Sequence, residues 1–389
     1  MSAAASGRAI RLLIAYVTAG TGHRRAAEAL AQAATTAWPG AEVECVDALQ
    51  FAPPWFRWLY PRTYLFLVRC TPWLWRMGYR FFDSALGHRL VQPLRRLWNL
   101  SLTRRFRRRL REHPVDGVVA THFLPADVCN SGKRAGWLRA PLVVVVTDLQ
   151  PHRFWLAQRA EAVVVATPRS ASVCFTRGIP ERRVHVLGIP VGRAFAAQAG
   201  VDTVRAKLSL DPKRLTVLVT SGGTTVGQFE QTVQALAALE EAYPGRAQLL
   251  VVCGDAEPAR RRLAARAAGW TMPVRVHGFV ETMPEFMAAS NLIVAKAGGL
   301  TISEALACGK PMVFYHVIPG QEEMNACHVA ERGAGIIASG SAAAGRAVAA
   351  LLAQPDRLEA MRAAARSLSR PRAAETIVAQ VLSPLLVRP

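Results

Sequence analysis

The sequence predicts an α/β protein of two Rossmann-like domains, and three observations support this prediction. The chain of 389 residues is long for one hydrophobic core and suits two. Of its residues 51% are hydrophobic and 19% are charged, a balance that excludes a disordered chain. A series of alternating strand and helix patterns begins near Ile10 and again near Leu215. We therefore expect domains at 1–196 and 197–370, and a closing helix at 371–389 that crosses back onto the first.

The first series opens with a buried strand, a glycine turn and an alanine-rich helix. The strand is expected at 10–17, the turn contains Gly20 and Gly22, and the helix spans 24–37. Strand, tight turn and helix in this order are typical of the start of a Rossmann-like domain. Further strands are expected at 42–46, 117–120, 142–147, 162–166 and 183–187.

The second series repeats this order. It starts with a strand at 215–220, a turn at 221–224 and a helix at 228–242. Because strands and helices alternate throughout, we expect both sheets to be predominantly parallel. The remaining strands are expected at 248–253, 274–277, 292–295, 311–315 and 335–338, and helices at 258–268, 283–289 and 302–307, before two closing helices.

Residues 51–113 interrupt the first series with an insertion that is both aromatic and basic. They hold 14 arginines, no lysine, two acidic residues and 14 aromatic residues. Interleaved aromatic and basic side chains suit a bilayer interface, where rings lie at headgroup depth and guanidinium groups meet phosphates. An ordinary helical insertion with its aromatics in a core, or a single-stranded nucleic-acid site, is the alternative. The expected membrane contacts are Trp55, Trp58, Trp73, Trp75, Arg104, Arg105, Arg107 and Arg108.

The net charge of +21 calls for an anionic partner, such as lipid, nucleic acid or a phosphorylated substrate. Seven scattered cysteines without a C-x-x-C pair indicate reduced core residues in a cytosolic protein. We expect neither a signal peptide nor a membrane span, because the N-terminus leads directly into a strand and no apolar run reaches 18 residues.

The glycine turns are candidate ligand loops. Gly20-x-Gly22-His23 precedes a helix, so its backbone can approach an anion and His23 can accept a proton from a hydroxyl. A purely structural histidine is the alternative. Ser221-Gly222-Gly223 forms the corresponding turn of the second domain, and an ordinary strand-to-helix turn is its alternative.

The segment from Lys296 to Glu304 is the best local signal. Two glycines precede a helix whose first turn can hold a diphosphate, and Glu304 is placed to accept hydrogen bonds from ribose hydroxyls. The pair Thr301-x-x-Glu304 can instead be a capping box that needs no ligand. Asp148 ends a predicted strand, where it is either a base or a helix N-cap. No Asp-x-Asp pair occurs, so we expect helix dipoles and backbone amides, not a metal, to stabilise a diphosphate.

These motifs, in this order, resemble the monogalactosyldiacylglycerol synthases and processive diacylglycerol glucosyltransferases. Those enzymes have the GT-B fold, two Rossmann-like domains facing across a cleft, and are related to the peptidoglycan-pathway GlcNAc transferase. The segment Thr147-Asp148 with His152 and Trp155 resembles a family motif near the acceptor. The implied donor contacts are Ser221, Gly222, Gly223, Gly254, Gly278, Phe279, Val280, Lys296, Gly298, Gly299, Leu300, Thr301, Glu304, Gln321, Glu322 and Asn325.

The resemblance implies an inverting, metal-independent and cofactor-free transfer of a hexose from a UDP-sugar to a diacylglycerol-type lipid. His23 or Asp148 would assist removal of the acceptor proton, with Gly20, Gly22, His152 and Trp155 near the acceptor. It also implies a cytoplasmic protein, peripheral at the inner face of the cell membrane. Glucose and galactose are the expected sugars. A UDP-GlcNAc transferase or epimerase, and a non-catalytic protein that binds membrane or, less expected, nucleic acid, remain the alternatives.

Overall fold

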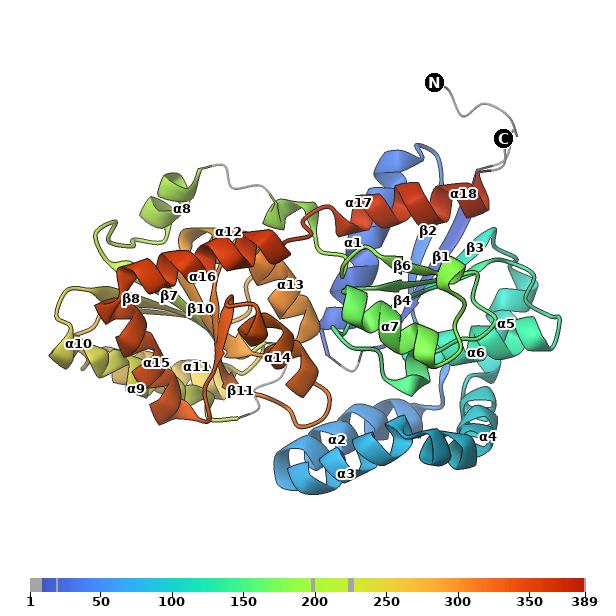
Figure 1. The fold of residues 1–389 in the computed structure, drawn as a ribbon, viewed down its shortest axis with the longest axis horizontal. Coiled ribbons are helices and arrows are strands. Elements are labelled where there is room, and N and C mark those ends of the chain that lie inside the picture. Colours follow the sequence, from blue (N-terminus) through green and yellow to red (C-terminus); the bar gives the residue numbers. More distant parts are fainter. Residues whose placement is uncertain (1–8, 19, 197–199, 223–226, 388–389) are drawn as a thin grey trace. The chain divides into compact units, whose positions relative to one another are not determined.

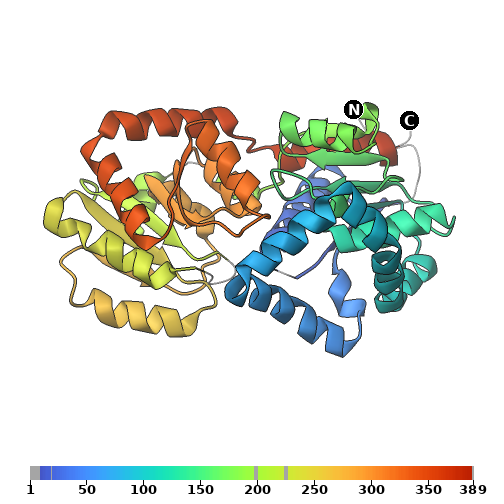
Figure 2. The same cartoon turned by 60° about the horizontal axis from the view of Figure 1, so that its bottom comes forward.

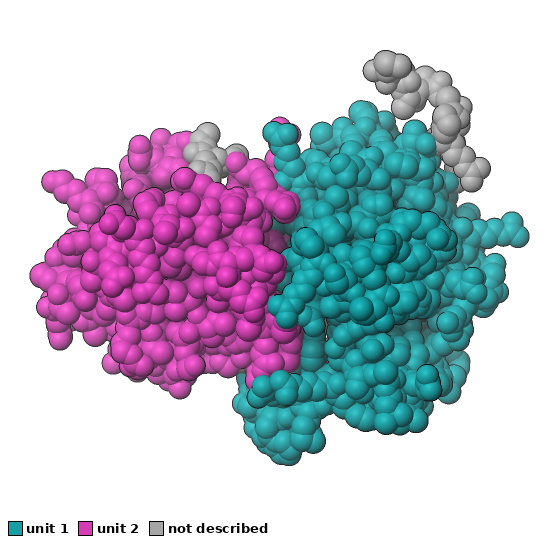
Figure 3. All heavy atoms as spheres, in the orientation of Figure 1, with its two compact units in different colours: residues 1–192, 372–389 teal, residues 193–371 magenta. Residues whose placement is uncertain are grey.

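The computed structural model describes residues 9–18, 20–196, 200–222 and 227–387. The chain divides into two compact units, coloured separately in Figure 3. The first unit comprises residues 1–192 and 372–389, and the second comprises residues 193–371. The C-terminal segment therefore joins the first unit, and the division falls four residues before the expected boundary.

The first unit is built on a six-stranded parallel sheet in the order β2-β1-β3-β4-β5-β6. The order reverses between β1 and β3, which makes this pair the topological switch point. The strands are β1 (Arg11–Tyr16), β2 (Glu42–Asp47), β3 (Gly117–Ala120), β4 (Leu142–Val145), β5 (Ala162–Val165) and β6 (Val184–Val186).

Helices cover both faces of this sheet (Figure 1). The α-helices are α1 (Gly22–Ala37), α2 (Pro54–Cys70), α3 (Pro72–Asp83), α4 (Ala85–Leu102), α5 (Arg104–Glu112), α6 (Phe123–Arg134), α7 (Pro168–Thr176), α17 (Ala373–Ile377) and α18 (Ser383–Leu386). Short 3-10 turns are η1 (Ala48–Phe51), η2 (Arg153–Trp155) and η3 (Glu181–Arg183), and η5 (Val378–Leu382) is a π-helix between α17 and α18.

Side chains along β1 point alternately to the two faces of the sheet, so each face has its own hydrophobic core. Leu12 and Ile14 lie in a cluster with α1 and the C-terminal segment, whose Ile377 is fully buried. Leu13 lies in the cluster on the other face, with Phe106 of α5 and Trp155. Burial of each large aliphatic side chain contributes about 1.5–3 kcal/mol. The C-terminal segment is therefore part of the first unit's core.

The insertion forms four helices, α2 to α5. Helix α2 packs against α3, α3 against α4, and α4 against α6 of the sheet layer. Figures 1 and 2 show α2 to α4 as blue to cyan helices gathered on one side of the first sheet. Helix α5 differs, because Phe106 and Leu110 bury its apolar stripe in the sheet's own core.

The second unit repeats the plan with a parallel sheet in the order β12-β11-β10-β7-β8-β9. Its switch point lies between β7 and β10. The strands are β7 (Leu215–Thr220), β8 (Ala247–Val252), β9 (Val274–His277), β10 (Leu292–Lys296), β11 (Met312–His316) and β12 (Gly335–Ile337). The helices are η4 (Arg193–Phe195), α8 (Val201–Lys207), α9 (Phe229–Ala237), α10 (Leu239–Ala242), α11 (Glu257–Ala267), α12 (Met283–Ala289), α13 (Gly299–Ala307), α14 (Glu323–Glu331), α15 (Ser341–Ala353) and α16 (Pro355–Leu368).

The element pattern follows the sequence prediction, with informative differences. The helix expected at 228–242 is two helices that meet at Ala238. Helix α13 begins at Gly299, three residues before the predicted start, and its N-cap is Gly298 without a side-chain cap. Thr301 therefore lies inside the helix, and the alternative of a Thr301–Glu304 capping box is wrong.

Candidate functional site

In the first unit, His23 lies at the switch point, where it joins the ends of three strands. Its Nδ1 is 2.9 Å from the carbonyl oxygen of Thr121, which follows β3, and 2.8 Å from Oγ1 of Thr147, which follows β4. The Thr121 hydroxyl donates in return to the His23 carbonyl at 2.9 Å. A carbonyl oxygen only accepts, so Nδ1 carries the proton and Nε2 keeps its lone pair. This is the tautomer that a general base needs.

Burial keeps His23 neutral. Desolvation lowers its pKa to about 4, and the hydrogen bond to Thr121 offsets only part of this shift. His122 lies edge-on at 4.7 Å between ring centroids, and burial followed by the charge of His23 lowers its pKa well below the usual value. Trp155, 2% exposed, backs both rings at centroid distances of 6.1 and 6.2 Å.

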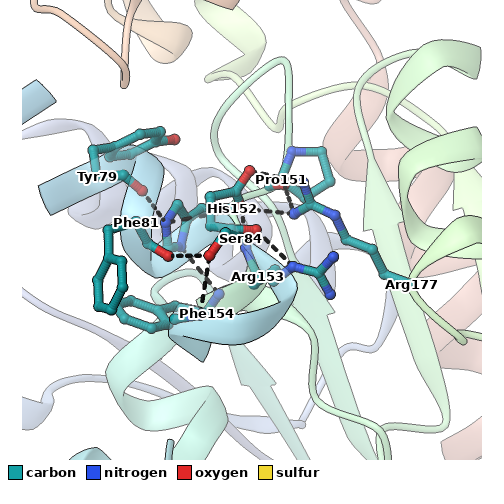
Figure 4. Close-up of polar contacts among 10 residues, drawn as sticks. Tyr79, Phe81, Ser84, Pro151, His152, Arg153, Phe154 and Arg177 are labelled. Carbon is teal, nitrogen blue, oxygen red and sulfur yellow. Dashed lines mark hydrogen bonds and ion pairs between the residues drawn. The ribbon is translucent and has the colours of Figure 1, made fainter. Parts of the chain in front are cut away.

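Two expected acceptor residues have structural roles. We expected His152 and Trp155 to lie near the acceptor, but Trp155 is a core residue behind His23 and His122. The buried His152 uses both ring nitrogens: Nδ1 accepts from the Phe154 amide and Nε2 donates to the Tyr79 carbonyl, each at 3.2 Å. Figure 4 shows this ring between α3 and the chain after β4. Asp148 directly follows Thr147 and is half-buried, so it stays a candidate.

A salt bridge that sequence reasoning missed fixes the insertion to the sheet layer. Asp83, at the end of α3, accepts two hydrogen bonds of 2.8 Å from the Arg177 guanidinium and one of 2.8 Å from the Arg153 amide. Burial alone would raise the pKa of Asp83, but the hydrogen bonds from Arg177 hold it below its usual value. The available signal was that Asp83 is one of only two acidic residues in 51–113.

The insertion also carries most of the exposed apolar surface. Thirteen of the sixteen exposed large hydrophobic side chains in the described residues belong to α2, α3 and α4. Among the expected membrane contacts, Trp55, Trp58 and Trp73 are 51%, 60% and 64% exposed. The other ten are Leu59, Phe66, Leu74, Met77, Phe81, Leu86, Leu90, Leu94, Leu97 and Trp98.

Two expected membrane contacts are less accessible than we predicted. Trp75 is half-buried, since its ring packs edge-on against Tyr64 of α2 at 5.3 Å and its indole nitrogen is buried. Arg107 is also half-buried, and its Nε is buried without a hydrogen-bond partner. On the same helix Arg104, Arg105 and Arg108 are exposed, and Arg108 pairs with Glu112 at 2.6 Å. In the described part of the chain, no helix has the length and apolarity required to cross a membrane.

In the second unit, four glycines meet at the carboxyl edge of the sheet. Gly222 and Gly254 follow β7 and β8 with φ of +67° and +58°, a region that favours glycine. A Cβ on Gly254 would lie 3.3 Å from the Gly222 carbonyl, and one on Gly222 would lie 3.6 Å from Cε of Lys296. Gly278 and Gly298 follow β9 and β10 at the same edge. Gly223 lies outside the described residues.

Lys296 and the start of α13 place positive potential beside these glycines. Lys296 ends β10 and is 7% exposed, and Gly298 and Gly299 begin α13, whose first amides have no side-chain cap. Leu300 is buried, and Glu304, 4% exposed, lies one turn further along the helix. The arrangement suits an anion at the helix N-terminus.

Hydrogen bonds from side chains of the protein fix the loop before α14. Glu322 accepts from the Ile318 amide at 3.0 Å, and Asn325 donates to the Ala297 carbonyl at 3.1 Å. Burial raises the pKa of Glu322, and the nearby Lys296 offsets part of the shift. Gln321 is half-exposed. Glu322 and Asn325, which we expected to contact the sugar, therefore use these groups to shape the loop.

Several other expected donor contacts lie at the same edge. Ser221 is buried at the end of β7, and its hydroxyl donates to the Cys253 carbonyl at 3.2 Å. Phe279 follows β9 and is 52% exposed, and Val280 is half-buried.

His316 was missed by the sequence analysis. It lies opposite Lys296 in the register of the neighbouring strands β10 and β11, and its Nε2 is buried without a hydrogen-bond partner. A Cβ on Gly227 would lie 2.6 Å from the His316 ring. The available signal was its position, because it directly follows the strand predicted at 311–315.

The comparisons with known proteins match each unit separately. Residues 23–191 match the family model of monogalactosyldiacylglycerol (MGDG) synthase, and residues 216–377 match that of the glycosyltransferase family 28 C-terminal domain. The spinach monogalactosyldiacylglycerol synthase is 31% identical over 335 residues, covering 84% of this chain and 63% of the relative. A Bacillus cereus processive diacylglycerol beta-glucosyltransferase is 27% identical over 293 residues, covering 75% and 74%. A probable rice synthase is 33% identical, and the chain spans only 46% of its length.

Solved structures match the whole chain in fold. Acinetobacter baumannii MurG has a TM-score of 0.63 at 16% identity, covering 96% of this chain and 99% of that one. The Staphylococcus aureus MnaA structure with UDP has a TM-score of 0.65 at 14% identity, covering 97% and 98%. The predicted fold class, two Rossmann-like domains of the GT-B type, is confirmed.

Proposed function

We propose that this chain is an inverting glycosyltransferase, because residues 23–191 match the monogalactosyldiacylglycerol synthase model and residues 216–377 match that of the glycosyltransferase family 28 C-terminal domain. It moves a hexose from a UDP-sugar to the hydroxyl of a diacylglycerol-type lipid. The observation that carries the proposal is the fixed tautomer of His23, whose Nε2 is available as a base at the first unit's switch point.

In the proposed reaction, Nε2 of His23 takes the proton of the acceptor hydroxyl as its oxygen attacks the anomeric carbon. The bond between that carbon and the diphosphate oxygen breaks, and UDP leaves with the electron pair. The proton on His23 then passes to water. Asp148, next to Thr147 in the chain, is the second candidate to receive the proton or to stabilise the imidazolium.

The second unit is proposed to bind the donor. The backbone at Gly222, Gly254 and Gly298, the N-terminus of α13 and the Lys296 ammonium receive the diphosphate charge. Glu304 accepts from the ribose, and Phe279 offers an exposed ring to the base. In this proposal no metal or cofactor takes part. Glucose and galactose are the first candidates for the sugar.

The exposed apolar side chains of α2 to α4 are proposed to dock the first unit on an anionic membrane surface. A concentration of exposed large apolar side chains is typical of an interaction surface in a folded protein. Each indole or leucine side chain that enters the lipid contributes about 1.5–3 kcal/mol, and each basic group near an anionic surface about 1 kcal/mol. We therefore propose a peripheral location at the inner face of the cell membrane, where the acceptor would keep its tails in the bilayer.

Mass spectrometry of the products tests this function. The full chain is incubated with diacylglycerol in anionic vesicles and with UDP-glucose, UDP-galactose and UDP-GlcNAc, each separately labelled. We expect a glycolipid with inverted anomeric configuration from one UDP-hexose and no product with His23→Asn. Release of UDP without glycolipid contradicts the lipid acceptor. Conversion of UDP-GlcNAc alone into its epimer would establish the alternative on the same fold.

A further inference from the structure

The interface between α4 of the insertion and α6 of the first sheet layer has a polar centre, beside an apolar end where Leu102 and Leu124 share a buried cluster. The exposed side of α4 carries Leu86, Leu90, Leu94 and Leu97, so its polar side turns inward. At the centre is Asp127 of α6, 5% exposed. It accepts from Asn99 at 2.7 Å and from Gln92 at 3.3 Å, and it pairs with Arg95 at 3.3 Å. The carboxylate is therefore satisfied from within the protein.

Beside Asp127 the same interface encloses a pocket of about 190 Å³. Asp127 is the only acidic residue in its lining, which contains four arginines. Arg177 is neutralised by Asp83, and Arg153 donates to the Asp83 carbonyl at 2.6 Å. The lining residues are His88, Gln92, Arg96, Asp127, Asn130, Ser131, Arg134, Arg153, Leu156, Gln158 and Arg177.

Several donors in this lining have no acceptor. Among the described residues, neither Arg96 nor Arg134 forms an ion pair with a carboxylate. Nδ1 of His88 is buried and has no hydrogen-bond partner. Asn130 uses its carbonyl oxygen for the Arg159 amide, at 2.8 Å, which leaves its NH₂ group for the pocket. Arg134 is exposed and Arg96 is half-buried, so water can solvate both guanidinium groups. A buried nitrogen without a partner, such as Nδ1 of His88, is rare and costly, and a ligand oxygen in the pocket could satisfy it.

The excess of donors over acceptors identifies the chemistry of this ligand. Guanidinium groups match the oxygens of a phosphate by two parallel hydrogen bonds, and a phosphate needs no acceptor from the protein. The volume of the pocket is several times that of one molecule in liquid water, about 30 Å³. We propose that this pocket binds a phosphate group, held by Arg96 of α4 and Arg134 of α6, with His88 and Asn130 as further donors.

A bound phosphate would join α4 to α6 and so brace the insertion against the sheet. It can come from free phosphate or from the headgroup of an anionic phospholipid. The lipid source rests on the proposed membrane function, whereas the phosphate site itself does not.

Calorimetry on the full chain tests the site with three probes: inorganic phosphate, dioctanoyl phosphatidic acid as monomers, and dioctanoylglycerol as the uncharged control. Arg96→Ala and Arg134→Ala are compared with Arg89→Ala on α4 and Arg139→Ala after α6, both exposed arginines outside the pocket lining. Loss of one charge-assisted pair is expected to weaken phosphate binding by about tenfold or more. The matched controls are expected to bind as the wild type does.

The His88 ring provides a second readout by NMR, assigned with a His88→Gln variant. Burial, followed by the charges of Arg95 on α4 and Arg153 after β4, lowers the pKa of His88, with Arg177 adding to the shift and Asp127 opposing it. A bound phosphate should raise this pKa in the wild type and not in Arg96→Ala.

Binding of inorganic phosphate with this response establishes a free-phosphate site, and binding of phosphatidic acid alone establishes a headgroup site. The proposal is overturned if neither binds, or if the pocket and control variants bind equally with no response of His88. Vesicle docking and glycolipid synthesis are measured separately, so their failure is distinguishable from failure of the phosphate site.

Discussion

Replacing His23 by asparagine tests the proposed catalytic base. The substitution removes Nε2 while keeping a side chain able to donate to the Thr121 carbonyl. Loss of a general base lowers kcat by about 10²–10⁴-fold. The residues proposed to bind the donor belong to the second unit, so binding of the UDP-sugar should not change. His113→Asn, an exposed histidine at the end of α5, is the matched control.

The pH dependence of the wild type adds a quantitative check. A base with the ordinary histidine pKa of about 6.5 would lose roughly 30-fold in its neutral fraction between pH 8 and pH 5. With its pKa lowered to about 4, His23 stays largely unprotonated over this range. The kcat/KM for the acceptor is measured at saturating donor. Titration of His23 is expected to change it by no more than about twofold between pH 8 and pH 5. A decline centred near pH 6.5, or a His23→Asn enzyme with nearly full kcat, would refute the reasoning.

Three further predictions address docking, packing and stability. The double variant Trp58→Ser, Trp73→Ser loses two exposed indoles, so its binding to anionic vesicles in a sedimentation assay should weaken by about 100-fold or more. Its binding of UDP should not change. Vesicle binding equal to that of the wild type would contradict docking through this face. Gly227→Ala should lower the free energy of unfolding in urea by more than Gly245→Ala does. Both glycines have positive φ, costing about 1–2 kcal/mol for alanine, but only the Gly227 Cβ would overlap the His316 ring; equal losses would exclude that overlap. Desolvation lowers the pKa of the buried His122 and His152 and of the half-buried His23 below the unfolded value, so as pH falls below about 6.5 the unfolded state takes up protons first. The unfolding free energy should therefore decrease towards pH 4 by up to about 1.4 kcal/mol per pH unit for each histidine, and an unchanged urea midpoint from pH 7 to 5 would contradict this.

The strands were predictable because parallel strands buried on both faces read as short apolar runs. The runs at 117–120 and 215–220 have the predicted bounds, and both lie in the centre of a sheet. The glycine turns were predictable for a related reason. Turns that leave a strand with a positive φ favour glycine, as at Gly222 and Gly254.

The roles of single side chains were harder to predict, because they depend on partners far away in the sequence. His152 follows a candidate carboxylate in a familiar motif, yet its ring anchors α3, and Tyr79 lies 73 residues earlier. Trp75 belongs to a run of aromatics that alternate between exposed and packed positions. Helical periodicity gives the spacing of such a run but not which side a neighbouring helix will cover.

The sequence by itself determined the fold class, the glycine segments that precede helices, and the basic, aromatic character of residues 51–113. These properties are local, since they follow from hydrophobic period, backbone freedom and charge. The tertiary structure alone decided which nitrogen of His23 holds the proton and where Arg96 and Arg134 converge. The physical reason is the order of strands and helices. Pairing of β1 with β3, and of β3 with β4, brings Thr121 and Thr147, 98 and 124 residues from His23, into hydrogen-bond distance of one ring.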